Sequence, residues 1–232
     1  MVKTIRFLAA AVLLGIAVLN DPARQVRGAE LGLKVVDKEP PKELDASIRD
    51  VLQSKAVQLI ESDKPVFEIW FRTEIPLKSP GESAEKALQS VRDAALLGIV
   101  IIGSDRRDYK DNDLAKGVYT ARFAFQPQDG NHLGTAEYPF FAVLTPVKRD
   151  NKLDGISDYK TLVKASSKDT PTDHPIILSL RPASATEGEF PKQNEPAPEH
   201  KSVRIKIPAK APDSSLKSSV VFELVYEGKG KL

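Results

Sequence analysis

The stretch GVYTARFAFQPQDGNHLG, residues 117–134, begins with the pattern of a β-strand and ends with the pattern of a tight turn. Its first half alternates, with Tyr119, Ala121, Phe123 and Phe125 on one side and Thr120, Arg122 and Ala124 on the other. A period of two is typical of a strand with one buried face. Its second half carries Asp129, Gly130, Asn131 and His132, which are residue types that close turns. The stretch therefore predicts a strand that faces a core and leaves it through a turn.

Further short apolar segments with turn residues between them recur along the chain. The strands expected from this pattern are 32–36, 55–61, 66–72, 96–103, 136–145, 174–182, 202–208 and 219–227. Short helical pieces are expected on connections at 46–52, 80–95 and 157–164, the second beginning at the capping box SPGE, in which Ser79 is the cap. Eight or nine mostly antiparallel strands with one or two short helices predict an all-β fold, an Ig-like or Greek-key β-sandwich.

Residues 1–28 have the pattern of a secretory signal peptide. Lys3 and Arg6 precede the apolar run Phe7–Leu19, which is shorter than the roughly 20 apolar residues of a spanning helix. Cleavage is expected after Gly28, and the alternative is an uncleaved membrane anchor. The protein is therefore expected to be exported, to the periplasm or the extracellular space.

The composition of the remaining chain excludes several kinds of site and partner. No other apolar run approaches spanning length, so no membrane span is expected after cleavage. The chain has no cysteine, which excludes disulfides and thiolate metal sites. The formal net charge is +2, and the signal segment carries four basic residues and one acidic residue, so the mature chain is near −1. Nucleic acid is therefore not an expected partner.

Residues 29–232 are long enough for one large domain. A division near residue 150 is the alternative, although it leaves the last three strands with a thin core. Residues 183–201 are rich in proline and glutamate and are expected to form a mobile loop.

Gly117 and Tyr119 are typical of a tyrosine corner. In Greek-key sandwiches a tyrosine near the start of a strand donates a hydrogen bond back to the preceding chain. The glycine gives the bend its backbone freedom. Tyr119 is therefore expected to have a structural role, anchoring the polar loop 104–117.

Residues 117–143 resemble the end of the periplasmic copper-resistance domain of the CopC type. In that Ig-like family a strand that opens G-x-Y-T is followed by a D-G-H turn, a glycine and a final strand. The matching positions are Gly117, Tyr119, Thr120, Asp129, Gly130, His132 and Gly134, with the final strand through Phe141 and Val143. The same pattern also resembles uncharacterised exported bacterial β-sandwich proteins, and that second resemblance implies a fold without a known activity.

The first resemblance implies that Asp129 and His132 bind copper(II). In the family a histidine at the mature N-terminus completes the ligand set, whereas here that residue is Ala29 or a neighbour, and the turn D-G-N-H is one residue longer. Copper(II) prefers a near-square set of nitrogen and oxygen ligands, for which two are not enough. The alternative is a structural turn without a cofactor, in which Gly130 takes a positive φ and Asn131 bonds the turn backbone.

Trp70 is the second candidate for binding. In the segment 66–72 it lies on the face opposite Phe67, Ile69 and Phe71. If that face is open, Trp70 forms a ligand platform together with Tyr138. The alternative is that a connection such as 80–95 covers Trp70, because large aromatic side chains are mostly buried.

Motifs of common enzymes are missing from the chain. It has no G-x-S-x-G nucleophile elbow, no H-E-x-x-H zinc motif and no glycine-rich phosphate loop. His174 is expected at the start of a strand and His200 in a loop. The sequence favours an exported non-enzymatic binding or structural module of the cell envelope, whose partner is an unknown protein or envelope component. A periplasmic copper-binding domain is the alternative, and an unrecognised hydrolase ranks third.

Overall fold

The computed structural model describes residues 31–107, 113–127, 132, 136–168, 170, 173–183, 185–198, 200–212 and 218–228. Leu31–Leu232 form one compact unit. The predicted signal peptide, residues 1–28, lies outside the described residues, as do Asp129, Gly130 and Asn131 of the predicted turn. No helix in the described part of the chain is long and apolar enough to cross a membrane.

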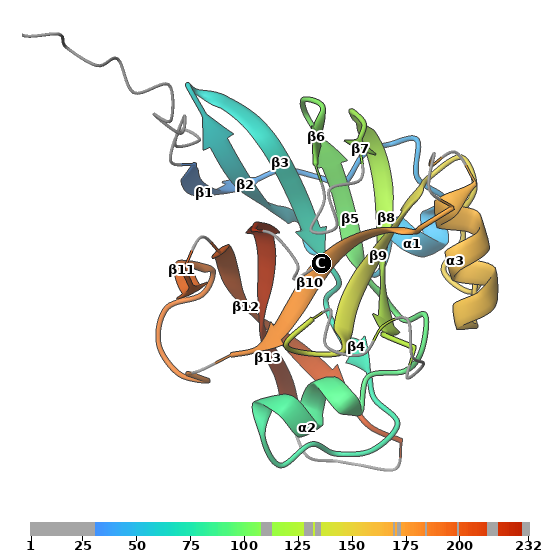
Figure 1. Ribbon diagram of the computed structural model, residues 1–232, viewed down its shortest axis with the longest axis vertical. Coiled ribbons are helices and arrows are strands. Elements are labelled where there is room, and N and C mark those ends of the chain that lie inside the picture. Colours follow the sequence, from blue (N-terminus) through green and yellow to red (C-terminus); the bar gives the residue numbers. More distant parts are fainter. Residues whose placement is uncertain are drawn as a thin grey trace, which may run out of the picture. The chain divides into compact units, whose positions relative to one another are not determined.

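An antiparallel sheet runs through the described residues and confirms the predicted all-β sandwich (Figure 1). Its strands, in spatial order, are β1 (Gly32–Asp37), β2 (Lys55–Glu61), β3 (Lys64–Phe71), β5 (Leu96–Ile102), β8 (Gly117–Phe125), β9 (Phe140–Pro146), β10 (Ile176–Pro182), β13 (Ser218–Glu227), β12 (His200–Lys210) and β11 (Lys192–Ala197). From β1 to β10 the spatial order of the strands is their order in the sequence. β13 then lies beside β10, and β12 and β11 follow in reverse sequence order toward the edge. This order, 10-13-12-11, is a Greek-key arrangement.

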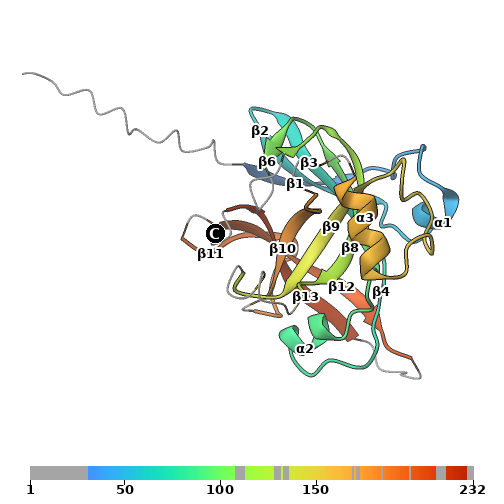
Figure 2. The ribbon, with the colours of Figure 1, turned by 45° about the vertical axis from the view of Figure 1, so that its right-hand side comes forward.

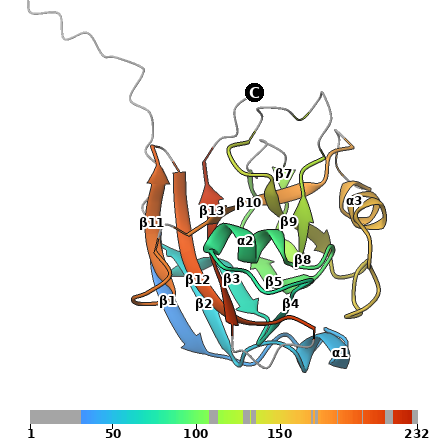
Figure 3. The same ribbon diagram turned by 90° about the horizontal axis from the view of Figure 1, so that it is seen from below.

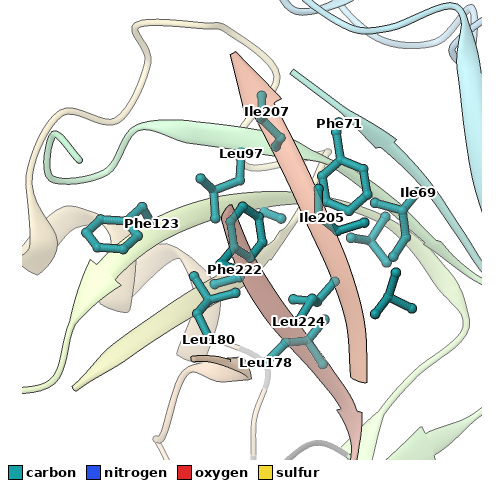
Figure 4. Close-up of a cluster of buried hydrophobic side chains, with 14 of the residues drawn as sticks. Ile69, Phe71, Leu97, Phe123, Leu178, Leu180, Ile205, Ile207, Phe222 and Leu224 are labelled. Carbon is teal, nitrogen blue, oxygen red and sulfur yellow. The ribbon is translucent and has the colours of Figure 1, made fainter. Parts of the chain in front are cut away.

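The sheet folds over, so that the strands of its two ends face each other across one core. Phe71 of β3 lies edge-on to Phe222 of β13, with ring centroids 6.4 Å apart. Figure 4 shows side chains of β12 and β13, such as Ile205 and Phe222, between their own strands and those of β3 and β5. The alternation predicted for residues 117–125 places Tyr119, Ala121 and Phe123 in this core, because each of them is buried.

Two contacts join the opposite layers of the sandwich. β4 (Ile75–Pro76) follows β3 in the chain and pairs in parallel with the end of β12. At the other end, the Gln193 side chain of β11 donates a hydrogen bond of 2.6 Å to the carbonyl of Leu31, next to β1. The two ends of the sheet path therefore meet, and Figure 3 shows β11 and β12 near β1 and β2. A further small pair, β6 (Arg106–Arg107) with β7 (Asp113–Leu114), forms a separate ribbon.

Three short helices lie on connections: α1 (Ala46–Arg49), α2 (Ala84–Gln89) and α3 (Tyr159–Ser167). α3 covers the outer face of β9 and β10, where Leu162 packs with Phe141, Val143 and Ile177 (Figure 2). α2 adds Ala87 and Leu88 to the main core. The predicted helix start at Ser79 is wrong: Ser83 is the cap, and its hydroxyl accepts from the Lys86 amide. Capping signals occur at both serines, and the helix is shorter than 80–95 because Val91 already pairs with Leu77 as a β-bridge.

The expectation of a mobile loop over the whole of 183–201 is wrong for Lys192–Ala197, which form the edge strand β11. This strand has no apolar alternation, and its polar side chains Gln193 and Asn194 make hydrogen bonds to other strands instead. The Asn194 amide donates to Glu223 of β13 at 2.8 Å, and Ser202 and Arg204 of β12 donate to the same carboxylate.

Candidate functional site

The tyrosine corner begins at the first residue of β8. The Tyr119 hydroxyl donates a hydrogen bond of 2.7 Å to the carbonyl of Ala115, which is the bond predicted for this residue. A Cβ atom on Gly117 would lie 3.3 Å from the Tyr119 ring, so the glycine leaves room for the ring to fold back. Burial raises the pKa of the Tyr119 hydroxyl, with Arg149 acting in the opposite direction and Asp105 in the same direction. The neutral, hydrogen-bonding form of the side chain is therefore favoured.

A hollow of about 620 Å³ lies beside this corner, and we call it the tyrosine-corner hollow. It is formed where β8 begins and β9 ends, together with residues from α3 and from the start of β10. The lining residues are Glu43, Asp113, Ala115, Lys116, Gly117, Val118, Tyr119, Pro146, Val147, Lys148, Arg149, Ser166, Thr170 and Ile176. Its volume is that of a small-molecule site, for which about 300–1,000 Å³ is usual.

Hydrogen bonds within the protein fix the walls of the hollow. The buried Ser166 hydroxyl donates to the carbonyl of Leu144 at 2.6 Å and accepts from the Ile176 amide at 3.0 Å. The Arg149 guanidinium donates to the carbonyl of Ala165 at 2.7 Å. α3 is thereby bound to the ends of β9 and β10 by polar contacts as well as by packing. These bonds hold the part of the wall that Arg149, Ser166 and Ile176 form.

The lining combines an apolar floor with charged groups. Val118, Pro146, Val147 and Ile176 supply apolar surface, while Lys116, Lys148 and Arg149 supply three positive charges against the carboxylates of Glu43 and Asp113. The lining is thus more polar than that of most ligand pockets, which are lined predominantly by apolar side chains. The arrangement suits a ligand with an apolar body and a polar or anionic end.

A second recess lies on the outer face of β8 and β9, beside the first turns of α3. We call it the histidine cleft; its volume is about 210 Å³. Its lining residues are Ala124, Phe125, Gln126, Pro127, His132, Phe141, Val143, Tyr159, Val163, Asp173, His174, Pro175 and Ile177. Within it the rings of His132 and His174 lie with centroids 6.2 Å apart and planes at 57°.

Backbone hydrogen bonds place both histidines. The Gln126 side chain, just after β8, donates to the carbonyl of His132 at 3.1 Å. The Thr170 hydroxyl donates to the carbonyl of His174 at 2.8 Å, two residues before β10 begins. The pairing joins residues 42 positions apart in the sequence, and it depends on β8 and β10 lying on either side of β9.

Of the two predicted metal ligands, His132 lies in the histidine cleft, whereas Asp129 lies outside the described residues. His174, expected only at the start of a strand, is the side chain found beside His132. Among the described residues, no group of three or more His, Cys, Asp or Glu side chains is arranged to hold a metal ion.

The proposed aromatic platform of Trp70 and Tyr138 is contradicted. Trp70 is 0% exposed, and its indole nitrogen donates to the carbonyl of Lys38 at 2.7 Å. The segment around α1, through Ile48 and Leu52, covers it, rather than the connection 80–95. Tyr138 packs against the main core instead, so the two rings belong to different clusters.

One buried ion pair was not predicted from the sequence. Arg122 of β8 and Asp150 are 1% and 0% exposed, and the guanidinium donates to the carboxylate at 2.6 and 2.9 Å. Arg122 also donates to the carbonyls of Lys152, Leu153 and Ile156. Its complete enclosure and its bonds to this loop make the pair a structural anchor for the connection between β9 and α3.

In comparisons with known proteins, no protein-family model, no curated protein and no solved structure matches the chain. A proposal for its function therefore rests on the fold and on these two recesses.

Proposed function

We propose that the protein is exported and acts in the cell envelope as a non-enzymatic β-sandwich binding module. The observation that carries this proposal is the tyrosine-corner hollow, which has the volume and the mixed lining of a ligand site. The ligand class that fits is a small organic molecule with an apolar body and a polar or anionic end. The apolar part would rest on Val118, Val147 and Ile176, and the polar end would lie near Lys116 and Lys148.

Two features support binding over catalysis at this place. The ionisable lining groups Glu43, Asp113, Lys116 and Lys148 are all exposed, so the site does not enclose a reacting group away from water. Ser166 and Tyr119 already use their hydroxyl hydrogens on the carbonyls of Leu144 and Ala115. Polar groups that hold the walls in place give a preformed surface, and a preformed surface reduces the ordering penalty of binding.

The test is a ligand-observed NMR screen with the mature protein and a library of envelope components: muropeptide fragments, monosaccharides and lipid headgroup analogues. Ala115→Trp places an indole in the hollow from an exposed position and leaves the carbonyl that Tyr119 uses. Gln89→Trp, on the exposed side of α2, is the matched control. We expect hits that bind the wild type and the control but not Ala115→Trp. Hits that bind Ala115→Trp as well as the wild type, or no hit at all, would contradict the proposal.

A second candidate function is metal binding in the periplasm, with copper as the cofactor and Asp129 and His132 as ligands. The observation that favours it is the second imidazole, that of His174, beside His132. The test is a titration of the mature protein with Cu(II) alone, compared with His132→Ala and Asp129→Asn. We expect one-to-one binding that both variants lose while circular dichroism shows an intact fold. Binding that is unchanged in both variants would exclude this turn as the site.

A further inference from the structure

From the position of the two rings in the histidine cleft, we infer that His132 and His174 together bind one divalent transition-metal ion, zinc or copper. This inference deepens the second candidate function, because it concerns the same recess, and it rests on the metal binding by His132 proposed there. It differs in the ligand set, since it names His174 as the partner of His132. Asp129 of the turn is not required by it.

The distance between the rings fits a shared ion. A ligating imidazole nitrogen lies about 2.0–2.1 Å from the ion and roughly 1.2 Å from its own ring centroid, so two imidazoles have centroids about 5.3 Å apart on a tetrahedral ion and about 6.4 Å apart on opposite sides of a square-planar ion. The observed separation is 6.2 Å. The observed separation is thus nearer to that of two imidazoles on opposite sides of one ion, the arrangement that copper(II) accepts most readily.

The surroundings of the pair suit a cation. Asp173, the residue before His174, lines the same cleft and brings a carboxylate to its wall. His174 is exposed at the mouth of the cleft, which gives an ion and its water ligands access from solvent. The opposite wall, from Phe141, Val143 and Ile177, is apolar and limits the number of waters around the ion. Imidazole with oxygen ligands is a set that both zinc and copper accept.

Binding would also have a structural consequence. His132 belongs to the connection after β8, and His174 belongs to the segment that leads into β10. An ion held by both would cross-link these two connections across the outer face of β9. The cross-link exists only in the folded state, so the metal should raise the unfolding temperature, and the stabilisation should grow with the logarithm of the metal concentration over Kd.

The experiment is a competition titration of the mature protein with Zn(II) alone and with Cu(II) alone against a chromophoric chelator. The variants are His132→Ala, His174→Ala, Asp173→Asn and Asp129→Asn. His200→Ala is the matched control, because His200 opens β12, where its Nδ1 contacts the Pro198 carbonyl, away from the cleft. All these changes are on side chains, so the backbone bonds from Gln126 and Thr170 remain, and circular dichroism checks the fold.

We expect one-to-one binding by the wild type and by His200→Ala. The affinity should fall by about 100-fold or more in both His132→Ala and His174→Ala, since even changes to the outer partners of a metal ligand lower affinity by about 10–100-fold. Asp173→Asn should fall by about tenfold or less, because it removes a nearby charge rather than an imidazole ligand. With Cu(II), pulsed electron paramagnetic resonance should show two coupled imidazoles in the wild type and one in His174→Ala.

The outcomes separate this inference from the turn site. Wild-type affinity in His174→Ala, with affinity lost in His132→Ala and Asp129→Asn, would overturn the inference and leave the turn site standing. Affinity lost in both histidine variants but kept in Asp129→Asn would support the inference and exclude Asp129 as a ligand. Affinity lost in all three would support the inference and add Asp129 as a ligand. No wild-type binding above the chelator would overturn both.

Discussion

Tyr119 connects the start of β8 to the chain that precedes it through one hydroxyl. Its hydrogen bond to the carbonyl of Ala115 spans four residues and shapes the edge of the tyrosine-corner hollow. The ring itself is packed in the main core. Removing the hydroxyl alone therefore separates the hydrogen bond from the packing.

Tyr119→Phe should lower the free energy of unfolding by about 1 kcal/mol, the usual net contribution of one hydrogen bond. Urea denaturation followed by circular dichroism measures the change. Tyr138→Phe is the control, because the Tyr138 contact with Arg181 is made by the ring. Equal stability of Tyr119→Phe and the wild type would show that the bond has no anchoring role.

The same variant should alter the response to alkali. The pKa of Tyr119 is raised in the folded protein by burial, so the folded state keeps this proton after the unfolded state has lost it. Its contribution to stability is thus complete below the ordinary tyrosine pKa of about 10 and falls as the pH rises above it. The stability difference between wild type and Tyr119→Phe should shrink as the pH is raised from roughly 9 to roughly 11.5, the range in which a tyrosine hydroxyl titrates. A difference that grows with pH would contradict the direction of the pKa shift.

The buried pair of Arg122 and Asp150 should be more sensitive than any exposed pair. Asp150→Ala leaves a buried guanidinium without its carboxylate, so we expect a loss of about 3–5 kcal/mol in urea denaturation. Asp93→Ala, which breaks the exposed pair with Lys78, should cost less than about 1 kcal/mol. A loss below about 1 kcal/mol for Asp150→Ala would mean that the loop reorganises around Arg122.

Residue roles were predictable where a local pattern carries them. Tyr119 and its bond follow from the glycine, the tyrosine and the strand after them. The partner of Arg122 could not be predicted from the local sequence, because Arg122 lies on the outer side of an alternating strand, where a charged residue is expected to meet solvent. Asp150 and the loop of Lys152 enclose it only in the folded chain. The pairing of His132 with His174 likewise depends on strand order.

At the scale of elements, α2 shows how two adequate signals compete. Ser79 and Ser83 are both helix caps by residue type, and the structure uses Ser83. Ser83→Ala should therefore lower stability by about 1 kcal/mol, the usual loss on removing a serine cap. Ser79→Ala, which affects only a contact with the Ser90 hydroxyl, should change it by less than about 0.5 kcal/mol. Thermal unfolding of the two variants side by side tests this. A larger loss of stability in Ser79→Ala than in Ser83→Ala would indicate that the helix begins at Ser79.

The strands were easier to predict than their edges. Those that face the core carry the alternation, and all of the eight predicted segments contain a strand. β9 begins at Phe140 rather than Ala136, because the residues before it lie outside the ladder with β8. β11 was missed because Gln193 and Asn194 make hydrogen bonds to other strands and no apolar alternation marks the segment. Hydrophobic patterns do not report a strand of that kind.

At the scale of the whole sandwich, the contact between the two ends of the sheet is the feature with the clearest test. The Gln193 amide donates both to the carbonyl of Leu31 and to the Tyr226 hydroxyl. Gln193→Ala should release the start of β1 and reduce amide-exchange protection of residues 32–37 by about tenfold or more, the factor for about 1.4 kcal/mol. Hydrogen exchange with mass spectrometry measures this, and protection across β8 and β9 serves as the internal control. Unchanged protection of 32–37 would show that β2 alone holds β1.

The sandwich class follows from many short alternating strands, whereas the recesses follow from how connections pack on the outer faces. α3 forms one wall of each recess, and its place over β9 and β10 has no local signal beyond its own apolar residues. The position of α1 likewise has no strong local signal, so the sequence left Trp70 as a candidate for an exposed face, whereas the α1 segment covers it. It gave no indication of the hollow beside Tyr119.

Amide chemical-shift mapping with a screening hit shows where on the sandwich a ligand binds. If the tyrosine-corner hollow is a ligand site, as we propose, the shifts should concentrate at residues 115–119 and 146–149, which line the hollow, and should be lost in Ala115→Trp. Shifts concentrated in β11–β13 or on α2, or shifts that persist in Ala115→Trp, would contradict it.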